Sequence, residues 1–402
     1  MHDWLRAAAR YHPRRVALEF ADRRELSYAE LLQAATSRAS VDDSQVGPRY
    51  IEGGDDFAIE LHAALLNGTP AVPLDPRLTA EERALRIVAG ELPYPGIATV
   101  MFTSGTTAAP KPVHLTLRNW EANAVGSALA LGLDQNERWL CVMPLAHVGG
   151  LSILMRSTLY ATTVVLHERF DTEAVLEQLM NPEREITLVS LVPTMLARLL
   201  DAGLERPPSL RWALLGGGPI ARPLLERAQR AGVPVAPSYG MTEGCSQIAT
   251  FGIPLHGVQM RLDDGEVVVT GPNFARNTLD ADGWLRTGDL GTHDRQGRLE
   301  IIGRRSETIV SGGENVAPAE VESVLLEHPA VADAGVFGRR DDEWGERVVA
   351  TVVLRDGQAV SPAELREFAA GRLARFKVPK EIGFAEALPR TASGKLLRRE
   401  LA

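Results

Sequence analysis

Short apolar runs and amphipathic helical patterns alternate along the first 250 residues of the chain. Apolar and β-branched runs predict strands at Ala71–Leu74, Thr99–Phe102, Glu137–Val142, Thr162–Leu166, Thr187–Leu191 and Arg211–Leu215. Apolar residues at helical spacing predict helices at Tyr28–Ser40, Phe57–Leu66, Trp120–Leu131, Thr172–Met180 and Thr194–Ala202. Because strands and helices alternate, the pattern predicts an α/β fold with a largely parallel sheet.

The pattern changes after about residue 256, where short strands follow one another without helices between them. The strands predicted there are Val258–Leu262, Glu266–Thr270 and Arg298–Ile302, separated by Asp-Gly and Gln-Gly turns, which favours a small antiparallel unit. Farther on, the pattern predicts helices at Pro318–Glu327 and Pro362–Leu373 and strands at Ala332–Phe337 and Glu346–Leu354. We therefore expect an N-terminal domain over 1–303, a hinge at 304–306 and a small α+β lid domain over 307–402.

Composition narrows the function classes. The chain has 402 residues, 43 Lys+Arg and 52 Asp+Glu, giving a net charge of −9, which disfavours a nucleic-acid-binding protein. No run of about 18 apolar residues predicts a membrane span, and the first residues do not predict a signal peptide. The chain has two cysteines, Cys141 and Cys245, and one disulfide cannot stabilise a chain of this size. We therefore expect a reducing, cytoplasmic compartment.

A polar segment, TSGTTAAPK, follows the predicted strand Thr99–Phe102 and runs from Thr103 to Lys111. Such a turn can direct backbone N–H groups and hydroxyls at phosphate oxygens. It is not a Walker A loop, because that motif requires Gly-Lys-[Ser/Thr], whereas Lys111 lies between two prolines. A polar surface turn explains the segment equally well.

Two later segments also follow predicted strands. Residues 216–219 read Gly-Gly-Gly-Pro, and the glycines would let a planar ligand approach the backbone. Residues 238–243 read SYGMTE. There Tyr239 can stack on a base, Thr242 can donate to a phosphate, and Glu243 can ligate Mg²⁺. A plain loop and a solvated turn are the alternative interpretations.

The C-terminal third adds two candidates. Asp289, in WLRTGDL, can accept hydrogen bonds from two ribose hydroxyls, although an Asp in a turn is an alternative. The chain has only four lysines, and Lys395 stands in the loop PRTASGK. An ammonium is a compact point charge that arginine does not replace at a crowded phosphate, but a lone loop lysine is usually a solvated charge.

In order along the chain, five segments resemble motifs of the adenylate-forming superfamily, which includes acyl- and aryl-CoA synthetases, luciferases and peptide-synthetase adenylation domains. The segments are TSGTTAAPK, SYGMTE, GWLRTGDLG, GRRSETIVSGGENVAPAEVE and LPRTASGK. The resemblance runs from about residue 13 to the end. A narrower resemblance, in Trp139–Ser157, Ile186–Leu200 and Arg304–Glu320, is to the o-succinylbenzoate–CoA ligase branch of menaquinone biosynthesis.

The resemblance implies a large N-terminal domain of layered sheets and helices, a small antiparallel β unit and a mobile C-terminal α+β lid. It implies an ATP-dependent acid–CoA ligase that acts through an acyl-adenylate and uses ATP, Mg²⁺ and coenzyme A, with o-succinylbenzoate as the expected acid. Its partners are then small molecules. A CoA ligase for another acid, an enzyme that loads a carrier-protein thiol and a non-catalytic relative remain alternatives.

The resemblance also assigns roles. It implies that Lys395 stabilises the adenylation transition state, with Thr242 at the phosphates and Glu243 as the metal ligand. The residues implied for the phosphates, nucleotide and thiol are Thr103, Ser104, Gly105, Thr106, Thr107, Lys111, Gly217, Gly218, Pro219, Ser238, Tyr239, Gly240, Met241, Asp289, Arg304, Gly312 and Gly313. For the acyl group the polar candidates are His147 and Arg156. A satisfied core histidine and a surface helix charge are the respective alternatives.

Three departures from the family pattern stand out. Ala108 and Pro112 replace glycines of the family's phosphate loop, which is expected to reduce loop mobility. Ser306 occupies a hinge position where many relatives carry Asp or Lys. The chain is also short for the family, and the missing length falls between about residues 36 and 100.

Overall fold

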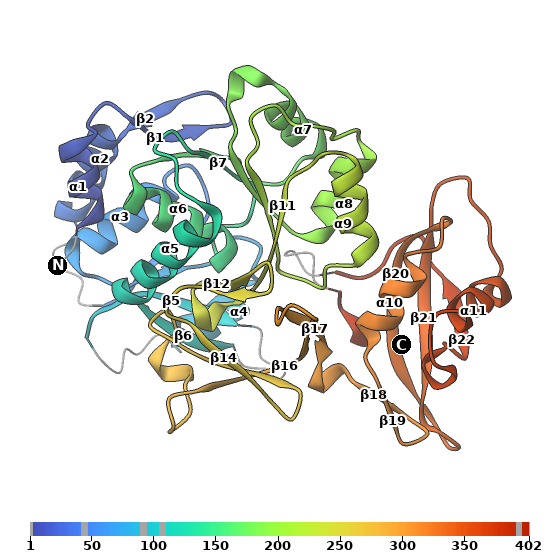
Figure 1. Ribbon diagram of the computed structural model, residues 1–402. Coiled ribbons are helices and arrows are strands. Elements are labelled where there is room, and N and C mark those ends of the chain that lie inside the picture. Colours follow the sequence, from blue (N-terminus) through green and yellow to red (C-terminus); the bar gives the residue numbers. More distant parts are fainter. Residues whose placement is uncertain (1–2, 42–46, 89–94, 104–109, 391–395, 402) are drawn as a thin grey trace.

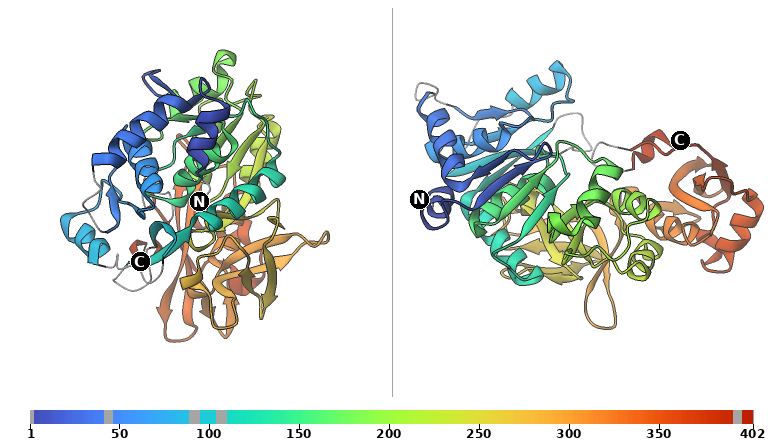
Figure 2. Two further views of the ribbon diagram at one scale, coloured as in Figure 1. Left: turned by 90° about the vertical axis from the view of Figure 1, so that its left-hand side faces the viewer. Right: turned by 90° about the horizontal axis from the view of Figure 1, so that it is seen from above.

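A large body and a smaller lid make up the computed structural model, which describes residues 3–41, 47–88, 95–103, 110–390 and 396–401 (Figure 1). Seen from above, the lid projects from one end of the body (Figure 2). The last body strand ends at Arg304, and a short 3₁₀ turn, η4 (Arg305–Glu307), leads into the lid. The domain boundary expected at 304–306 falls on this connection and stays a prediction.

A nine-stranded sheet forms the centre of the body, in the order β13-β12-β11-β10-β9-β7-β8-β1-β2. Its strands are β1 (Val16–Phe20), β2 (Glu25–Ser27), β7 (Arg138–Cys141), β8 (Thr163–Leu166), β9 (Leu188–Leu191), β10 (Trp212–Leu215), β11 (Val235–Met241), β12 (Ser246–Thr250) and β13 (Ile253–Pro254). The inner strands from β1 to β11 pair in parallel, whereas β2, β12 and β13 pair antiparallel at the two edges. This confirms the predicted α/β class.

Alternating side chains bury both faces of this sheet. In β7, Trp139 and Cys141 belong to the core that includes α5 and α6, whereas Leu140 packs with α7, α8 and α9. Strand residues two apart share a face, so a continuous apolar run is what a strand covered on both sides requires. The helices of the body are α1 (Trp4–Tyr11), α2 (Tyr28–Val41), α3 (Phe57–Asn67), α4 (Ala80–Val88), α5 (Leu117–Leu131), α6 (Val148–Tyr160), α7 (Thr172–Met180), α8 (Pro193–Asp201) and α9 (Arg222–Arg230).

Local signals set several helix ends. Thr116 and Asn119 form a capping box at the start of α5, and Asp171 caps α7 through the backbone N–H of Ala174. Helix α3 ends at Gly68, whose φ of +68° suits glycine. The sequence pattern predicted these helix ends to within a few residues.

A second sheet has the order β3-β4-β5-β6. Its strands are β3 (Arg49–Ile51), β4 (Ala71–Pro73), β5 (Ile97–Thr103) and β6 (Lys111–Thr116). Strands β5 and β6 are antiparallel, and Thr103 lies opposite Lys111 in their register. The two ends of the segment TSGTTAAPK therefore lie side by side.

The antiparallel unit and the lid complete the fold. The unit contains β14 (Gln259–Asp263), β15 (Glu266–Thr270), β16 (Leu285–His293) and β17 (Leu299–Arg304), which pair in that order. The lid has its own hydrophobic core and contains β18 (Ile309–Ser311), β19 (Glu314–Val316), α10 (Pro318–Leu325), β20 (Val331–Asp341), β21 (Gly345–Leu354), α11 (Pro362–Ala370) and β22 (Glu381–Phe384). Within the described ranges, no helix is long and apolar enough to cross a membrane.

Candidate active site

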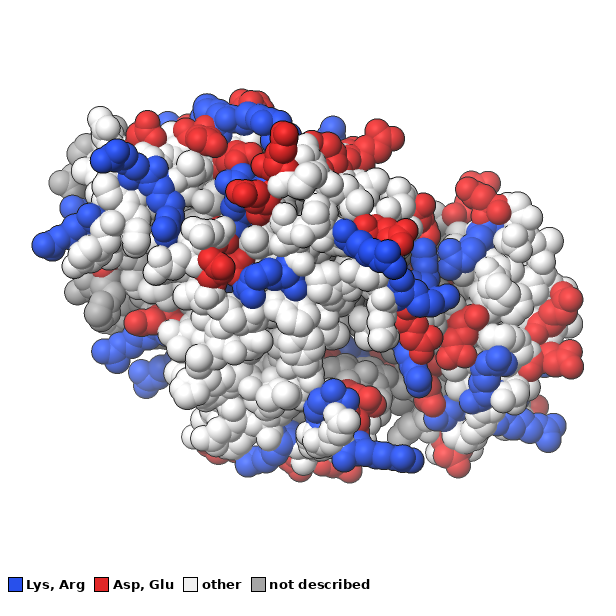
Figure 3. Space-filling model, turned by 45° about the horizontal axis from the view of Figure 1, so that its top comes forward, with Lys and Arg blue, Asp and Glu red and all other residues white. Residues whose placement is uncertain are grey.

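A long cleft runs between the body and the lid and along the carboxyl ends of the central strands. On the face drawn in Figure 3, charged side chains of both signs gather where body and lid meet. Ligands of open α/β sheets bind at the carboxyl ends of the strands. The predicted site residues that line the cleft are Thr103, Lys111, His147, Gly217, Gly218, Pro219, Ser238, Tyr239, Gly240, Met241, Thr242, Glu243, Asp289 and Arg304.

Three of these residues, from three strands, bond to one another. The Tyr239 hydroxyl donates to Asp289 Oδ2 at 2.8 Å, and Arg304 Nε lies 2.6 Å from Asp289 Oδ1. The Asp289 carboxylate is buried. Burial and the neighbouring carboxylate raise the pKa of Tyr239 far above its usual value, so its hydroxyl stays neutral and remains a donor. Two partners therefore hold the orientation of the Asp289 carboxylate.

The segment SYGMTE forms the end of β11 and the turn after it. At Gly240, a Cβ would lie 1.7 Å from the carbonyl oxygen of Ser246, so the tight β11–β12 pairing requires glycine there. The turn η2 (Thr242–Gly244) then places Glu243 in the cleft. In the described part of the chain its carboxylate makes no hydrogen bond or ion pair, so it is free to meet a cation.

His147 occupies the N-cap position of α6 and also lines the cleft. Its Nε2 lies 3.7 Å from Asp75 Oδ2, and its side chain is 40% exposed. The alternative interpretation, that His147 is a core histidine whose ring nitrogens are hydrogen-bonded inside the protein, is therefore wrong. Burial against its neighbours lowers the pKa of His147, an effect that Asp75 opposes.

Arg156 lies two turns farther along α6 and is 1% exposed, so the alternative that it is a surface charge is wrong. It is not among the residues that line the cleft. Its Nη2 donates to Asn123 Oδ1 at 2.7 Å, and its guanidinium lies 5.7 Å from the centre of the Trp139 ring. Within the described ranges, its Nε and Nη1 have no hydrogen-bond partner. Burial lowers the pKa of Arg156 to about 10.

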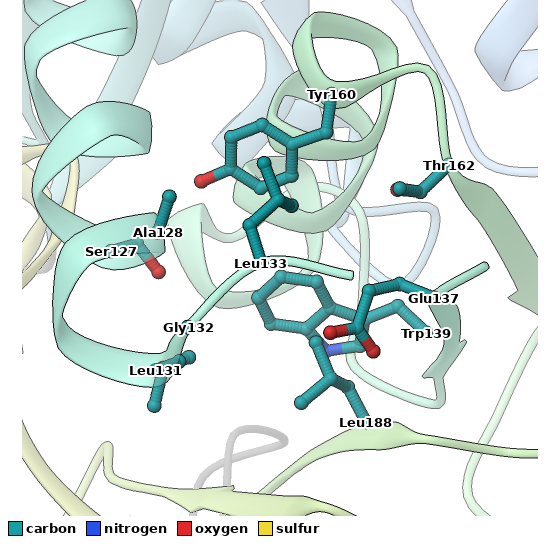
Figure 4. Close-up of a pocket in the computed structure, with 10 residues that line it drawn as sticks. All are labelled: Ser127, Ala128, Leu131, Gly132, Leu133, Glu137, Trp139, Tyr160, Thr162 and Leu188. Carbon is teal, nitrogen blue, oxygen red and sulfur yellow. The ribbon is translucent and has the colours of Figure 1, made fainter. Parts of the chain in front are cut away.

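A small pocket lies beside Trp139, near the start of β7 (Figure 4). In Figure 4 the rings of Trp139 and Tyr160, the side chain of Leu133 and, on α5, Ser127 line it. Its volume is close to that of one water molecule. No residue predicted for the site lines it, so it does not extend the candidate site.

Several predicted residues fall outside the described residues, namely Ser104, Gly105, Thr106, Thr107 and Lys395. The positions on both sides of the stretch 391–395, which includes Lys395, are described. Arg390 and Leu396 form an isolated β-bridge, and both line the cleft. The chain that carries Lys395 thus borders the cleft before and after the undescribed stretch.

Gly312 and Gly313 do not line the cleft in this arrangement. They form the turn between β18 and β19, with φ values of +62° and +83°. The exposed ring of Trp344 packs so closely on Gly312 that a Cβ there would lie 2.7 Å from it. The structure therefore does not bring these two glycines together with the other predicted residues.

Sequence reasoning missed charged cleft residues between residues 36 and 100. Asp75 and Arg77 follow β4, and Arg86 lies on α4 with its guanidinium 6.0 Å from the centre of the Phe102 ring. Arg77 forms an ion pair with Asp75. The positions of Asp75 and Arg77 in the sequence did offer a signal, because charged residues directly after a predicted strand are candidates for the cleft. Arg86 carried no motif signal.

Comparison with known proteins places the chain in a family. The model for "AMP-binding enzyme" matches residues 95–277, and that for "AMP-binding enzyme C-terminal domain" matches residues 320–395. The chain is 37% identical to 2-succinylbenzoate–CoA ligase of Bacillus subtilis (strain 168), covering 99% of this chain and 97% of the relative.

Solved structures of o-succinylbenzoate CoA synthetase (MenE) from Bacillus subtilis are also similar. The complex with the acyl-adenylate intermediate OSB-AMP has a TM-score of 0.89 at 37% identity, covering 99% of this chain and 97% of that chain. The complex with ATP and magnesium ion has a TM-score of 0.88 at 36% identity, covering 99% of each chain. A double mutant bound to the product analogue OSB-NCoA has a TM-score of 0.71 at 37% identity, covering 99% and 97%. At this identity and coverage, the chain belongs to the AMP-binding enzyme family.

Proposed function

We propose that this chain is an acid–CoA ligase that converts o-succinylbenzoate, ATP and CoA into o-succinylbenzoyl-CoA, AMP and pyrophosphate. The observation that carries the proposal is the likeness over almost the whole chain to a synthetase whose structure was solved in complex with OSB-AMP. The cleft supports it, because the residues expected for nucleotide binding converge there. Both cysteines are free and buried, which supports a cytoplasmic location.

In the first half-reaction, the carboxylate of the acid attacks the α-phosphorus of ATP and pyrophosphate leaves. Two anions must meet, so the site has to position them and offset their charge. We assign the ribose hydroxyls to Asp289, whose orientation Tyr239 and Arg304 fix. Lys111 at the start of β6 and Lys395 supply positive charge at the phosphates.

Glu243 is the residue that would hold magnesium. In the described part of the chain, no group of three or more His, Cys, Asp or Glu side chains could form a metal site. That fits Mg²⁺, which is commonly held by one or two carboxylates together with the phosphates of a substrate. When bound, the ion offsets phosphate charge. Glu243 contributes a free carboxylate on a turn whose backbone is fixed, since its carbonyl accepts from the N–H of Ala275 at 2.8 Å.

In the second half-reaction, the thiol of CoA attacks the acyl carbon and AMP leaves. We propose that the lid rotates about residues 304–306 and brings Gly312 and Gly313 to the cleft. At equal identity, the TM-score is 0.89 to the OSB-AMP complex and 0.71 to the OSB-NCoA complex, which supports two arrangements of body and lid. In the arrangement described here, Arg305 donates to the carbonyl of Asp264 at 3.1 Å, and Arg355 lies 3.9 Å from Asp201.

Arg156 is our candidate for the second carboxylate of o-succinylbenzoate. Two nitrogens of this buried cation have no hydrogen-bond partner among the described residues, which is costly unless an anion joins them. A guanidinium fits a carboxylate well. Arg156 lies nine residues beyond His147, about 13 Å along the helix. This separation supports a position for Arg156 at the deep end of an acyl site that begins at the cleft.

The proposal is tested by measuring pyrophosphate release from ATP with a panel of aryl, alkyl and dicarboxylic acids, each with and without CoA. We expect release to require an acid and to be fastest with o-succinylbenzoate, and we expect the CoA thioester to form when CoA is added. Faster turnover of another acid would contradict the substrate assignment. No release with any acid would favour the non-catalytic alternative.

A further inference from the structure

A buried amide on α5 joins two parts of the candidate site that are far apart in the sequence. Asn123 is 1% exposed. Its Oδ1 accepts from Arg156 Nη2 at 2.7 Å, and its Nδ2 donates to the carbonyls of Gly244 at 3.2 Å and Gln247 at 2.7 Å. The side chain thus lies between the guanidinium and the turn that follows Glu243.

The chemistry of the partners fixes the orientation of this amide. A guanidinium only donates, and a backbone carbonyl only accepts. Turning the amide over would place its NH₂ group against Arg156 and its oxygen against two carbonyl oxygens. Both hydrogens of the amide are used in the observed orientation, so Asn123 cannot move without leaving buried polar groups unpaired.

The turn beyond Glu243 has a backbone that needs such support. Cys245 and Ser246 have φ values of +58° and +93°, a backbone region that residues other than glycine rarely adopt. Two buried amides hold the turn at one carbonyl, because Asn273 Nδ2 also donates to the Gly244 oxygen, at 3.0 Å. Where Glu243 points therefore depends on these amides.

We propose that Asn123 is a positioning residue for Glu243 in the turn η2, and that it links this turn to Arg156. The roles of Glu243 and Arg156 in this inference rest on the proposed function. Asn123 does not line the cleft, so it acts through the turn rather than on a substrate. Its loss should weaken Mg²⁺-dependent nucleotide binding in particular.

Asn123→Asp tests the inference, because the aspartate has the same shape but cannot donate to the Gly244 and Gln247 carbonyls. Calorimetric titration with ATP, in the absence of acid and CoA, would compare excess Mg²⁺ with excess EDTA. We expect the variant to bind Mg·ATP about tenfold more weakly. Its binding of metal-free ATP should stay within about twofold of that of the unaltered chain.

Ser127→Ala is the matched control. Ser127 lies one turn farther along α5 and is equally buried, but it donates to the side chain of Gln247 and not to the turn. We expect it to bind Mg·ATP normally. Asn273→Ala removes the other donor to the Gly244 oxygen and should also weaken Mg·ATP binding. It keeps the inference testable if Asn123→Asp does not fold.

Normal Mg·ATP binding by a folded Asn123→Asp chain, or by Asn273→Ala where that is the variant that folds, would overturn the inference. Equal weakening with and without Mg²⁺ would also overturn it, because a merely structural residue would act that way. The titration contains no acid, so a wrong acyl assignment leaves its outcome unaffected. Failure of the unaltered chain to bind Mg·ATP would contradict the proposed function itself.

Discussion

At the end of the cleft that we assign to the nucleotide, Tyr239, Asp289 and Arg304 come from three strands and already bond to one another. At the end that we assign to the acyl group, His147 is partly exposed, and farther along α6 lies the buried Arg156, two of whose nitrogens have no hydrogen-bond partner among the described residues. The nucleotide end is preorganised for a ligand common to a whole family. The acyl end leaves polar groups unsatisfied, so its ligand must complete it. Substitutions at the nucleotide end should therefore weaken the use of ATP, whereas substitutions at the acyl end should weaken the use of the acid.

The largest expected effect is at Lys395. Lys395→Ala should slow adenylation about 10²–10³-fold, because it removes roughly 3–4 kcal/mol of transition-state stabilisation. When supplied with preformed acyl-AMP, the same variant should keep much of its thioester-forming rate. Single-turnover assays of each half-reaction would measure both. Equal losses in the two would contradict the lid-rotation account.

Asp289→Asn keeps the shape of the side chain but removes the charge that pairs with Arg304. Hydrogen bonds to charged groups contribute about 1.5–3 kcal/mol, so we expect KM for ATP to rise about 10–100-fold. KM for the acid should change little, and steady-state kinetics with each substrate varied would measure both values. A rise confined to the acid would show that the two ends are assigned the wrong way round.

Arg156→Met removes the buried cation and keeps an apolar side chain of similar length. We expect KM for o-succinylbenzoate to rise about tenfold or more, with KM for ATP unchanged. Arg184→Met is a control, because Arg184 is also largely buried but forms an ion pair with Glu177. If the Arg156 variant keeps its KM for the acid, then Arg77 and Arg86 become the candidates for the second carboxylate.

Tyr239→Phe should have the smallest effect. It removes one hydrogen bond to Asp289 and leaves the ion pair with Arg304, so a loss of about 1 kcal/mol is expected. That corresponds to a rise in KM for ATP of roughly fivefold. Because the hydroxyl does not ionise in the working range, the effect should be the same from pH 6 to 9. A pH-dependent difference would contradict the role of Tyr239 as a neutral donor.

The same contrast explains what the sequence could predict. The apolar runs of β7 to β10 and the capping signals of α5 and α7 are local, so these elements were predicted within a few residues. The residues of the nucleotide end stand in recognisable motifs. Tyr239 lies near the end of the parallel strand β11, whereas Asp289 and Arg304 face each other on the antiparallel strands β16 and β17. Strands such as β12 and β22 were missed, because they depend on pairing with partners rather than on a pattern of their own.

The acyl end could not be predicted in this way. Neither the burial of Arg156 nor the bridge through Asn123 has a sequence signal, because the partners of Asn123 lie 33 and more than 120 residues away. The position of Arg86 in the cleft also depends on the packing of α4 near Phe102 of β5. Such contacts are set by tertiary packing and not by the local pattern.

The central claim is that the nucleotide end serves general adenylation chemistry while the acyl end selects a second carboxylate. The most direct measurement is kcat/KM for o-succinylbenzoate relative to benzoate, which lacks the succinyl carboxylate, in the unaltered chain and in Arg156→Met. The account predicts a strong preference for o-succinylbenzoate that falls in the variant, with the value for benzoate nearly unchanged. A preference for benzoate in the unaltered chain, or an undiminished preference in the variant, would contradict it.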